Sequence, residues 1–599
     1  MTETAEPETD VSRIRWDLTD LFASPDDPEI EESLRRSLGF AQDFEQRYKG
    51  RLAELPSAEF ASMMEELATH LGATAKPAIY AQLLHSLNAS DHAAGRLMSR
   101  IREAGAERGR HLVFFSLELA KLTDEQTARL YADPRCLPYR HTIEVERRYR
   151  EHQLTEPEER LLTELSPVGS SAWSRLFGEL CAAMTVDVDG QTVPLMTALA
   201  KLHEGDRAVR EDATHAITRT LERDQHTRAY IFNVLLQDKS IGDRLRGYPT
   251  WISARNLANE TSDEAVQALV DAVTDRYDLV ARYYRVKRRL LGLDELHEWD
   301  RYAPLEATSR EVGWQEARDL VLSSYHRFSP RAGALVGRFF DAPWIDAPVS
   351  EGKRGGAFCA GATPDLHPYV LLNFTGQLKD ALTIAHELGH GLHDLLAGER
   401  NHIFDYHPPL TLAETASVFG EQLTFDAVLA QERDAAVRLS LLCRQVEDQF
   451  ATIFRQVAMN RFEDAVHAAR RASGELSDDE IGKLWQEKIQ AMFGDSLTLT
   501  GEHRPWWSYV EHFVHTPGYV YAYAYGNLLA LSLYRRYRED RSPEFADRYL
   551  DFLALGGSQA PDEAVRTVGV DIGDPGFWRS GLDILGGMVD EVERLTASA

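Results

Sequence analysis

Apolar residues recur every three to four positions along most of the chain, with charged residues between them. This periodicity is typical of amphipathic helices. The segments that show it most clearly are residues 28–50, 57–72, 92–122, 207–238, 263–292 and 434–472. The pattern therefore predicts a mainly α protein.

Two short segments break the helical pattern and predict β structure. Residues 183–195 alternate around Asp189 and Gly190, which predicts a hairpin with a primed turn. Residues 367–374 form a short apolar run after a glycine-rich stretch, which predicts a small strand and loop. We take the hairpin as a boundary marker and expect an N-terminal helical domain over 1–200 and a second domain over 201–599.

Composition narrows the classes of partner and compartment. The 599 residues carry a formal charge of -29, which disfavours binding to nucleic acid or to anionic membranes. The four cysteines form no CxxC pair, and the N-terminus lacks the features of a signal peptide. No apolar run approaches the roughly 18 residues that a membrane span needs. We expect a cytoplasmic protein, and the sequence leaves its oligomeric state open.

One segment combines a helical pattern with residues that can bind a metal. The sequence DALTIAHELGHGLHDLLAG, residues 380–398, begins with Asp380 as a plausible N-cap and ends with Gly398 as a plausible stop. Within it, His386, Glu387 and His390 form HExxH. The i, i+4 spacing puts both imidazoles on one face of the helix, where they can share one ion.

The glutamate of this motif is predicted to act as a base and not as a metal ligand. Glu387 lies about 100° round the helix axis, off the metal but near a metal-bound water, which is where a general base is needed. Two imidazoles and a carboxylate fit one Zn²⁺ per chain best. The alternative is a solvated pair of helical histidines. The sequence also leaves cobalt or manganese open.

A third ligand must come from outside the motif. The extended metzincin pattern is excluded, because the chain has His393 and Leu396 where that pattern has glycine and histidine. His393 could itself be a ligand, but three consecutive turns of one helix converge poorly on one ion.

The following segment, residues 408–430, offers Glu414, Glu421 and Asp426 on a second helix. Glu414 is the best candidate ligand, although Thr411 and Glu414 also fit a capping box. Glu421 lies on nearly the same face and is either a partner of a ligand histidine or, more plainly, a solvated acid.

At these residues a family resemblance becomes specific. DALTIAHELGHGLH followed by PLTLAETASVFGE resembles the zinc site of the thimet oligopeptidase (M3) family of metallopeptidases, in its oligoendopeptidase F branch. The resemblance implies His386, His390 and Glu414 as zinc ligands and Glu387 as the catalytic base. It also implies a helical shell with a deep substrate channel, and it is strongest over residues 350–530.

A distal aromatic segment, residues 509–534, gains meaning from the same resemblance. Its tyrosines alternate as in a strand, but Tyr519 and Tyr523 also have helical spacing, so the pattern leaves both structures open. In similar enzymes a histidine and tyrosines of this region face the zinc. Tyr519 is the first candidate to donate to the oxyanion, with Tyr523, His512 or His515 as its partner. Gly518 is expected to be a hinge or a plain turn.

The expected function is zinc-dependent hydrolysis of internal bonds in short peptides. A deep channel would exclude folded proteins, and the strand near residues 369–374, with Asn373 at its end, could hold an extended peptide by strand addition. A zinc exopeptidase is the nearest alternative, but we identify no charged anchor for a substrate terminus. A noncatalytic helical peptide-binding protein would not need Glu387.

Overall fold

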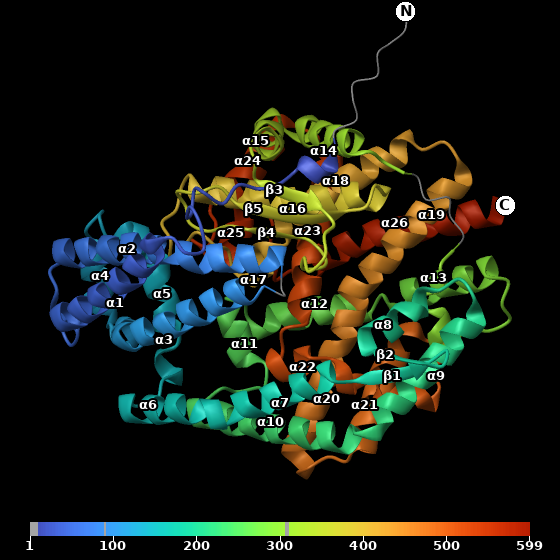
Figure 1. Ribbon diagram of the computed structural model, residues 1–599, viewed down its shortest axis with the longest axis horizontal. Helices are drawn as coiled ribbons and strands as arrows, with labels where there is room; N and C mark the ends of the chain where they lie inside the picture. Colours follow the sequence, from blue (N-terminus) through green and yellow to red (C-terminus); the bar gives the residue numbers. More distant parts are fainter. Residues whose placement is uncertain (1–9, 89–90, 306–310, 599) are drawn as a thin grey trace, which may run out of the picture. The chain divides into compact units, whose positions relative to one another are not determined.

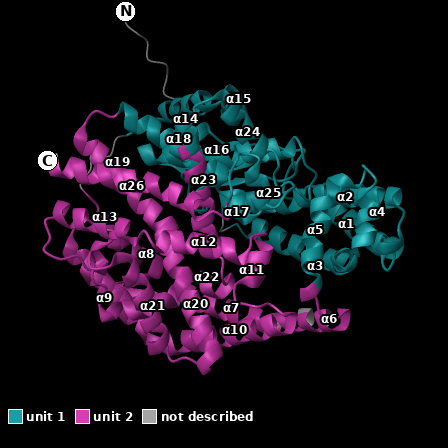
Figure 2. Cartoon of the chain, turned by 180° about the vertical axis from the view of Figure 1, so that it is seen from behind, with its two compact units in different colours: residues 1–150, 309–431, 536–571 teal, residues 151–308, 432–535, 572–599 magenta. Residues whose placement is uncertain are grey.

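The computed structural model describes residues 10–88, 91–305 and 311–598 and is mainly α-helical (Figure 1). The chain forms two compact units, each assembled from three separate segments (Figure 2). The first unit holds 1–150, 309–431 and 536–571, and the second holds 151–308, 432–535 and 572–599. Because the units interleave along the chain, the division near residue 200 into consecutive domains stays a prediction.

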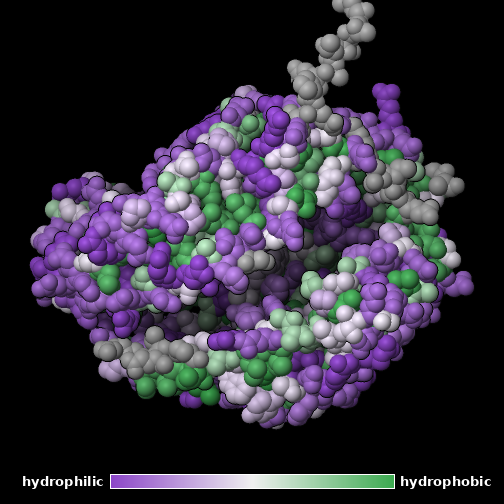
Figure 3. Space-filling model, in the orientation of Figure 1, coloured by the Kyte–Doolittle hydropathy of each residue, from purple (hydrophilic) through white to green (hydrophobic). Residues whose placement is uncertain are grey.

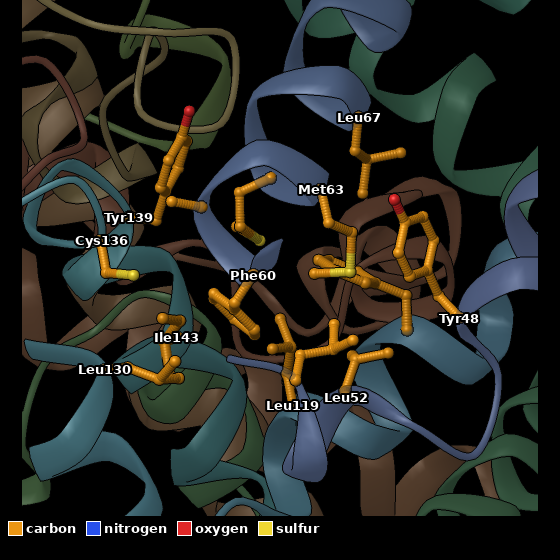
Figure 4. Close-up of a cluster of buried hydrophobic side chains, with 14 of the residues drawn as sticks. Tyr48, Leu52, Phe60, Met63, Leu67, Leu119, Leu130, Cys136, Tyr139 and Ile143 are labelled. Carbon is orange, nitrogen blue, oxygen red and sulfur yellow. The ribbon is translucent and has the colours of Figure 1, made fainter. Parts of the chain in front are cut away.

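The N-terminal part of the first unit is a helical bundle. It consists of α1 (Pro28–Tyr48), α2 (Ser57–Leu87), α3 (His92–Lys121), α4 (Asp124–Tyr131) and α5 (Arg140–Arg148). Asp27 caps α1 by accepting a hydrogen bond from the backbone N–H of Glu29, and Pro28 occupies the first helical position. Buried side chains such as Phe60, Met63 and Leu119 form one apolar cluster at its centre (Figure 4).

The rest of the first unit is a small sheet with helices packed on it. The sheet has β3 (Ile345–Pro348), β4 (Phe358–Ala360) and β5 (Tyr369–Phe374). The helices are α14 (Trp314–Phe328), α15 (Pro330–Asp341), α16 (Leu378–Gly398), α17 (Leu410–Ala413), α18 (Thr415–Gln431), α24 (Pro543–Leu553) and α25 (Pro561–Arg566). The helix α16 packs against α18 and β5 (Figure 1). The predicted strand and the helix that follows it are both confirmed.

The strand order of this sheet corrects one expectation. β5 lies in the centre, parallel to β3 and antiparallel to β4. Both sides of β5 are therefore paired, and Asn373 donates to the backbone oxygens of Arg354 and Gly356. Strand addition at residues 369–374 is wrong, because a central strand has no edge to offer. β3 and β4 are the edge strands of this sheet.

The second unit is helical apart from the hairpin of β1 (Thr185–Val188) and β2 (Gln191–Pro194). Asp189 and Gly190 have φ angles of 54° and 71°, which confirms the primed turn. Its helices are α6 (Glu156–Leu165), α7 (Ser170–Ala182), α8 (Leu195–Ala200), α9 (Arg207–Arg223), α10 (Gln225–Arg246), α11 (Ser253–Ala258), α12 (Asp263–Thr274), α13 (Tyr277–Leu290), α19 (Ala435–Gln449), α20 (Arg455–Ser473), α21 (Asp478–Phe493), α22 (His512–His515) and α26 (Pro575–Ser598). The helix α23 (Tyr521–Glu539) continues from this unit into the first.

Three long segments predicted as helical are interrupted in the second unit. Residues 207–238 divide between α9 and α10 at Asp224, and residues 263–292 divide between α12 and α13. A π-helical turn, Phe450–Phe454, separates α19 from α20. Amphipathic periodicity shows that the segments are helical but does not locate these breaks, since the apolar face continues across them.

The surface and the cysteines agree with the composition. Hydrophilic residues cover most of the face shown in Figure 3. Cys136, Cys181, Cys359 and Cys443 are all free thiols. Among the residues that the structure describes, no helix is both long enough and apolar enough to cross a bilayer.

Candidate metal centre

The N-cap of helix α16 lies three residues earlier than predicted. Gln377 is its N-cap, and Asp380 stands at the third helical position. The Asp380 carboxylate accepts hydrogen bonds from the backbone N–H groups of Thr375 and Gln377, at 2.7 and 3.1 Å, and from the Thr375 hydroxyl. Asp380 therefore closes the turn between β5 and α16 as part of a capping box. The predicted end of the helix at Gly398 is confirmed.

Three predicted ligands converge on one point in the first unit. Nε2 of His386 and Nε2 of His390 each lie 3.4 Å from the same oxygen, Oε2 of Glu414. All three ligand atoms lie within 4.8 Å of one another. A tetrahedral ion with bonds of about 2.1 Å needs ligand atoms about 3.4 Å apart, so the residues fit a zinc ion that keeps one open position.

The third ligand, Glu414, directly follows the short helix α17. Glu414 lies at the junction between α17 and α18, and Thr411 lies inside α17. The capping box of Thr411 and Glu414 is therefore wrong, because Thr411 does not precede a helix. Ser417 donates from its hydroxyl to Oε2 of Glu414 at 2.8 Å. Burial opposes ionisation of Glu414, but hydrogen bonds and charge from the two histidines lower its pKa below the usual range.

The glycine inside the motif allows the two helices to meet. A methyl group at Gly389 would lie 2.5 Å from Cα of Ser417 on α18, which is closer than real carbon contacts. On α14, Tyr325 donates from its hydroxyl to the Ala385 oxygen of α16 at 2.7 Å. Gly389 therefore permits the backbone approach that brings Glu414 to the histidines.

Glu387 occupies a different environment from the ligands. Its side chain is 7% exposed, and the backbone N–H of Cys359 on β4 donates to its carboxylate. Burial raises the pKa of Glu387, while His386 and His390 act in the opposite direction. A buried carboxylate with a raised pKa, beside the metal ligands but outside their cluster, is suited to moving a proton.

The remaining acids and histidines of this region take other roles. Oε2 of Glu421 lies 3.1 Å from Nδ1 of His386, so Glu421 orients a ligand and the simpler interpretation as a solvated acid is wrong. Gln422 donates to Asp426. His393 is buried outside the ligand cluster, and burial lowers its pKa to about 3. This position removes His393 as a rival ligand.

The aromatic segment lies in the second unit and is helical at His512–His515 and again from Tyr521 onwards. Nε2 of His512 lies 3.3 Å from the Tyr523 hydroxyl, and the rings of His512 and Tyr519 are parallel at 6.3 Å. The structure thus brings His512, Tyr519 and Tyr523 together. His515 is exposed and points toward α7, where a methyl group at Gly178 would lie 3.5 Å from its Nε2. Their roles in catalysis stay predictions.

A turn precedes Tyr519, and hydrogen bonds to the side chains of Glu463, which is buried, and Arg255, which is half-buried, hold it. Gly518 has a φ angle of +74° and donates from its N–H to Oε1 of Glu463 at 2.8 Å. Arg255 donates from Nε to the Pro517 oxygen at 3.3 Å. The pattern of residues around Gly518 indicates a turn, and the structure shows what holds it.

Comparison with known proteins identifies the family. A family model described as peptidase family M3 matches residues 200–584. The chain belongs to peptidase family M3. A second model, described as oligopeptidase F, matches residues 118–185. The predicted resemblance is confirmed, and the chain is a peptidase of the oligoendopeptidase F branch.

Several relatives of this M3 peptidase share almost its full length. Group B oligopeptidase PepB of Streptococcus agalactiae is 26% identical over 596 residues, which cover 98% of this chain and 97% of that protein. Oligopeptidase PepF of Bacillus subtilis is 28% identical and covers 76% of this chain and 69% of its own. The crystal structure of oligoendopeptidase-F from Enterococcus faecium has a TM-score of 0.74 at 22% identity, over 96% of this chain and 99% of that one.

Three residues that shape the M3 site were not predicted from the sequence: Ser417, Glu463 and Arg255. Ser417 follows Glu414 at helical spacing, which could have indicated a hydroxyl facing the same carboxylate. Glu463 and Arg255 are far from Gly518 in sequence, and no local pattern relates them to the turn that they hold.

Proposed function

We propose that this M3 peptidase is a zinc-dependent oligoendopeptidase that hydrolyses internal bonds of short peptides. The observation that carries the proposal is the pair of 3.4 Å distances from His386 and His390 to one oxygen of Glu414. These distances match the edges of a tetrahedral zinc site with three protein ligands. Three ligands leave a position for water, which is the arrangement of catalytic rather than structural zinc.

The chain's own residues supply the proton transfers. When bound, zinc polarises a carbonyl and makes water acidic enough to lose a proton near neutral pH. Glu387 takes that proton and passes it to the leaving amine, and the Cys359 N–H holds its carboxylate in place. Glu421 and Ser417 orient His386 and Glu414.

The form of the substrate is proposed from the sheet and from the relatives. β4 is an edge strand, and the N–H of its middle residue Cys359 points to Glu387, so an extended peptide added to this edge would pass beside the base. Relatives are named oligopeptidase or oligoendopeptidase. We extend that preference for short peptides to this chain, and we assign Tyr519 as donor to the oxyanion.

Cleavage of a quenched fluorescent peptide, blocked at both ends, tests the proposal. We expect the wild type to cleave it and Glu387→Gln to lose at least about 10³-fold in kcat while binding the same amount of zinc. Glu399→Gln, an exposed residue at the end of the same helix, is the matched control. Cleavage of only unblocked peptides would identify an exopeptidase, and equal activity of Glu387→Gln would exclude its role as base.

A further inference from the structure

Two arginines of the second unit meet at one tyrosine hydroxyl. Arg301 follows the short helix Glu298–Asp300, and Arg455 is the first residue of α20. Both donate to the Tyr302 oxygen, at 2.5 Å from Arg301 and 3.4 Å from Arg455. Arg455 also forms a hydrogen bond with Tyr509. Like charges this close repel, so an arrangement of this kind is favourable only beside an anion.

The nearby carboxylates do not supply that anion. Glu447 is paired with Lys287 at 2.6 Å, and Asp300 is paired with Arg207 and Arg210. Within the described part of the chain, neither Arg301 nor Arg455 forms an ion pair. These two unpaired positive charges are unusual in a protein with a formal charge of -29.

Further buried donors at this place also lack partners. His503 is 3% exposed, and neither of its ring nitrogens has a hydrogen-bond partner in the described ranges. Nε of Arg301 is likewise buried and unpaired. Burial and the charges of Arg301 and Arg455 hold the pKa of His503 well below its usual value, so its neutral ring offers one N–H. Buried polar groups of this kind need a partner, which can be water, an ion or a ligand.

We propose that Arg301 and Arg455, with the hydroxyls of Tyr302 and Tyr509, form a binding site for a small oxyanion. Two guanidinium groups suit the geometry of a carboxylate or a phosphate. The Tyr302 oxygen accepts from both arginines, so its O–H remains to donate to the anion. All four side chains are half-buried and therefore reachable from solvent. Arg455 directly follows a π-helical turn, a rare element that is frequent at functional sites.

The anion can come from a peptide substrate or from free solution, and an experiment can distinguish these two sources. Burial lowers the pKa of His512, and the charge of nearby Arg455 acts in the same direction. The site therefore adjoins the cluster of His512, Tyr519 and Tyr523. One source is a carboxylate of a peptide substrate, an identification that rests on the proposed function. The other is a free inorganic anion, which does not depend on it.

Calorimetric titration of the full chain with inorganic phosphate at constant ionic strength tests the site. We expect saturable binding by the wild type, roughly tenfold or more weaker binding by Arg301→Gln and Arg455→Gln, and no change in Arg444→Gln, an exposed arginine on α19. If either site variant fails to fold, the comparison of Arg455→Lys with the wild type tests the site. Lysine keeps the charge but lacks the planar guanidinium that binds two oxygens, so Arg455→Lys should bind phosphate more weakly.

Peptides distinguish the two sources. On the inactive Glu387→Gln protein, a peptide with a free C-terminal carboxylate should displace phosphate while its amide does not, if a substrate supplies the anion. Equal behaviour of the two peptides with phosphate binding intact supports the site and assigns it to a free anion. Because this measurement needs no cleavage, it stands even where the proposed peptidase activity fails.

The alternative to a bound anion is a negative charge on Tyr302 itself. Burial opposes ionisation of Tyr302, but Arg301 and Arg455 lower its pKa below the usual value, so a phenolate could itself balance the charges. Absorbance of tyrosinate at neutral pH, present in the wild type and absent from Tyr302→Phe, together with no binding of phosphate or carboxylate by the wild type, would exclude the site.

Discussion

Nδ1 of His386 lies 3.1 Å from Oε2 of Glu421, while Nε2 of the same ring lies 3.4 Å from Oε2 of Glu414. The imidazole is thus held from both sides. A carboxylate beside Nδ1 keeps the proton on that nitrogen and leaves the lone pair of Nε2 for a metal. Glu421 therefore fixes both the tautomer and the direction of the ligand.

Removing Glu421 should weaken zinc binding more than it changes the fold. We expect Glu421→Ala to lower zinc affinity by about 10–100-fold, because the ring of His386 can then rotate and lose its tautomer preference. Competition with a chelator measures this affinity directly. Glu421→Gln can still accept a hydrogen bond from Nδ1, so its zinc affinity should lie between those of the wild type and Glu421→Ala. Asp426→Asn, the next acid on α18, should bind zinc as the wild type does, and a loss as large as that of Glu421→Ala would argue against this role.

Gly389→Ala should disturb the junction of α16 and α18. The added methyl would lie 2.5 Å from the backbone of Ser417, so one helix must move and carry Glu414 with it. We expect a loss of about 1–3 kcal/mol in the free energy of unfolding and weaker zinc binding. Thermal unfolding and zinc content measure the two effects.

The control for this substitution is Gly105→Ala on α3, where no atom lies within 4 Å of the added carbon. It should leave stability unchanged or raise it by up to about 1 kcal/mol, since alanine favours helix. Equal stability and zinc content of Gly389→Ala and the wild type would show that the helices do not need this glycine.

The helical fold and the ligands could be predicted because their determinants are local. His386 and His390 share a helix face by spacing alone, and Asp189 with Gly190 encode their own turn. The central position of β5 could not be predicted, since its apolar run says nothing about which strands pair with it.

Local patterns also misled where two structures share one pattern. Thr411 and Glu414 match a capping box, but α17 begins one residue before Thr411, so tertiary packing decides the use of Glu414. The charge cluster of Arg301 and Arg455 is built from distant segments, and only the folded chain shows that neither arginine forms an ion pair with another described residue.

The cluster of His512, Tyr519 and Tyr523 predicts different effects for its two tyrosines. We expect Tyr519→Phe to lower kcat by about 10²–10³-fold with little change in KM, because a donor to the oxyanion acts only as charge develops. Tyr523 contacts His512 at 3.3 Å, and Tyr523→Phe should have a smaller effect. Steady-state kinetics separates the two. A Tyr519→Phe enzyme with unchanged kcat would exclude the assignment. Tyr525→Phe, at a buried tyrosine of α23, is the control for general damage to this aromatic segment.

Glu463 should make the stability of the protein depend on pH. Burial raises its pKa to about 8 from 4.5, while the Gly518 N–H and Arg255 act in the opposite direction. The folded state therefore holds a proton that the unfolded state releases between pH 4.5 and about 8. Stability from this group is complete below pH 4.5 and is lost as pH rises, by about 1.4 kcal/mol for each pH unit in that window.

Glu463→Gln tests this linkage because glutamine can accept from the Gly518 N–H but does not ionise. The stability of the wild type should fall with rising pH because Glu463 ionises, and the variant should lack this fall. The unfolding temperature of the variant minus that of the wild type should therefore increase from pH 5 to pH 8. Glu475→Gln, an exposed residue after α20, should follow the wild type at each pH. A constant difference between Glu463→Gln and the wild type would mean that Glu463 is already ionised in the fold, held so by Arg255 and the turn at Gly518.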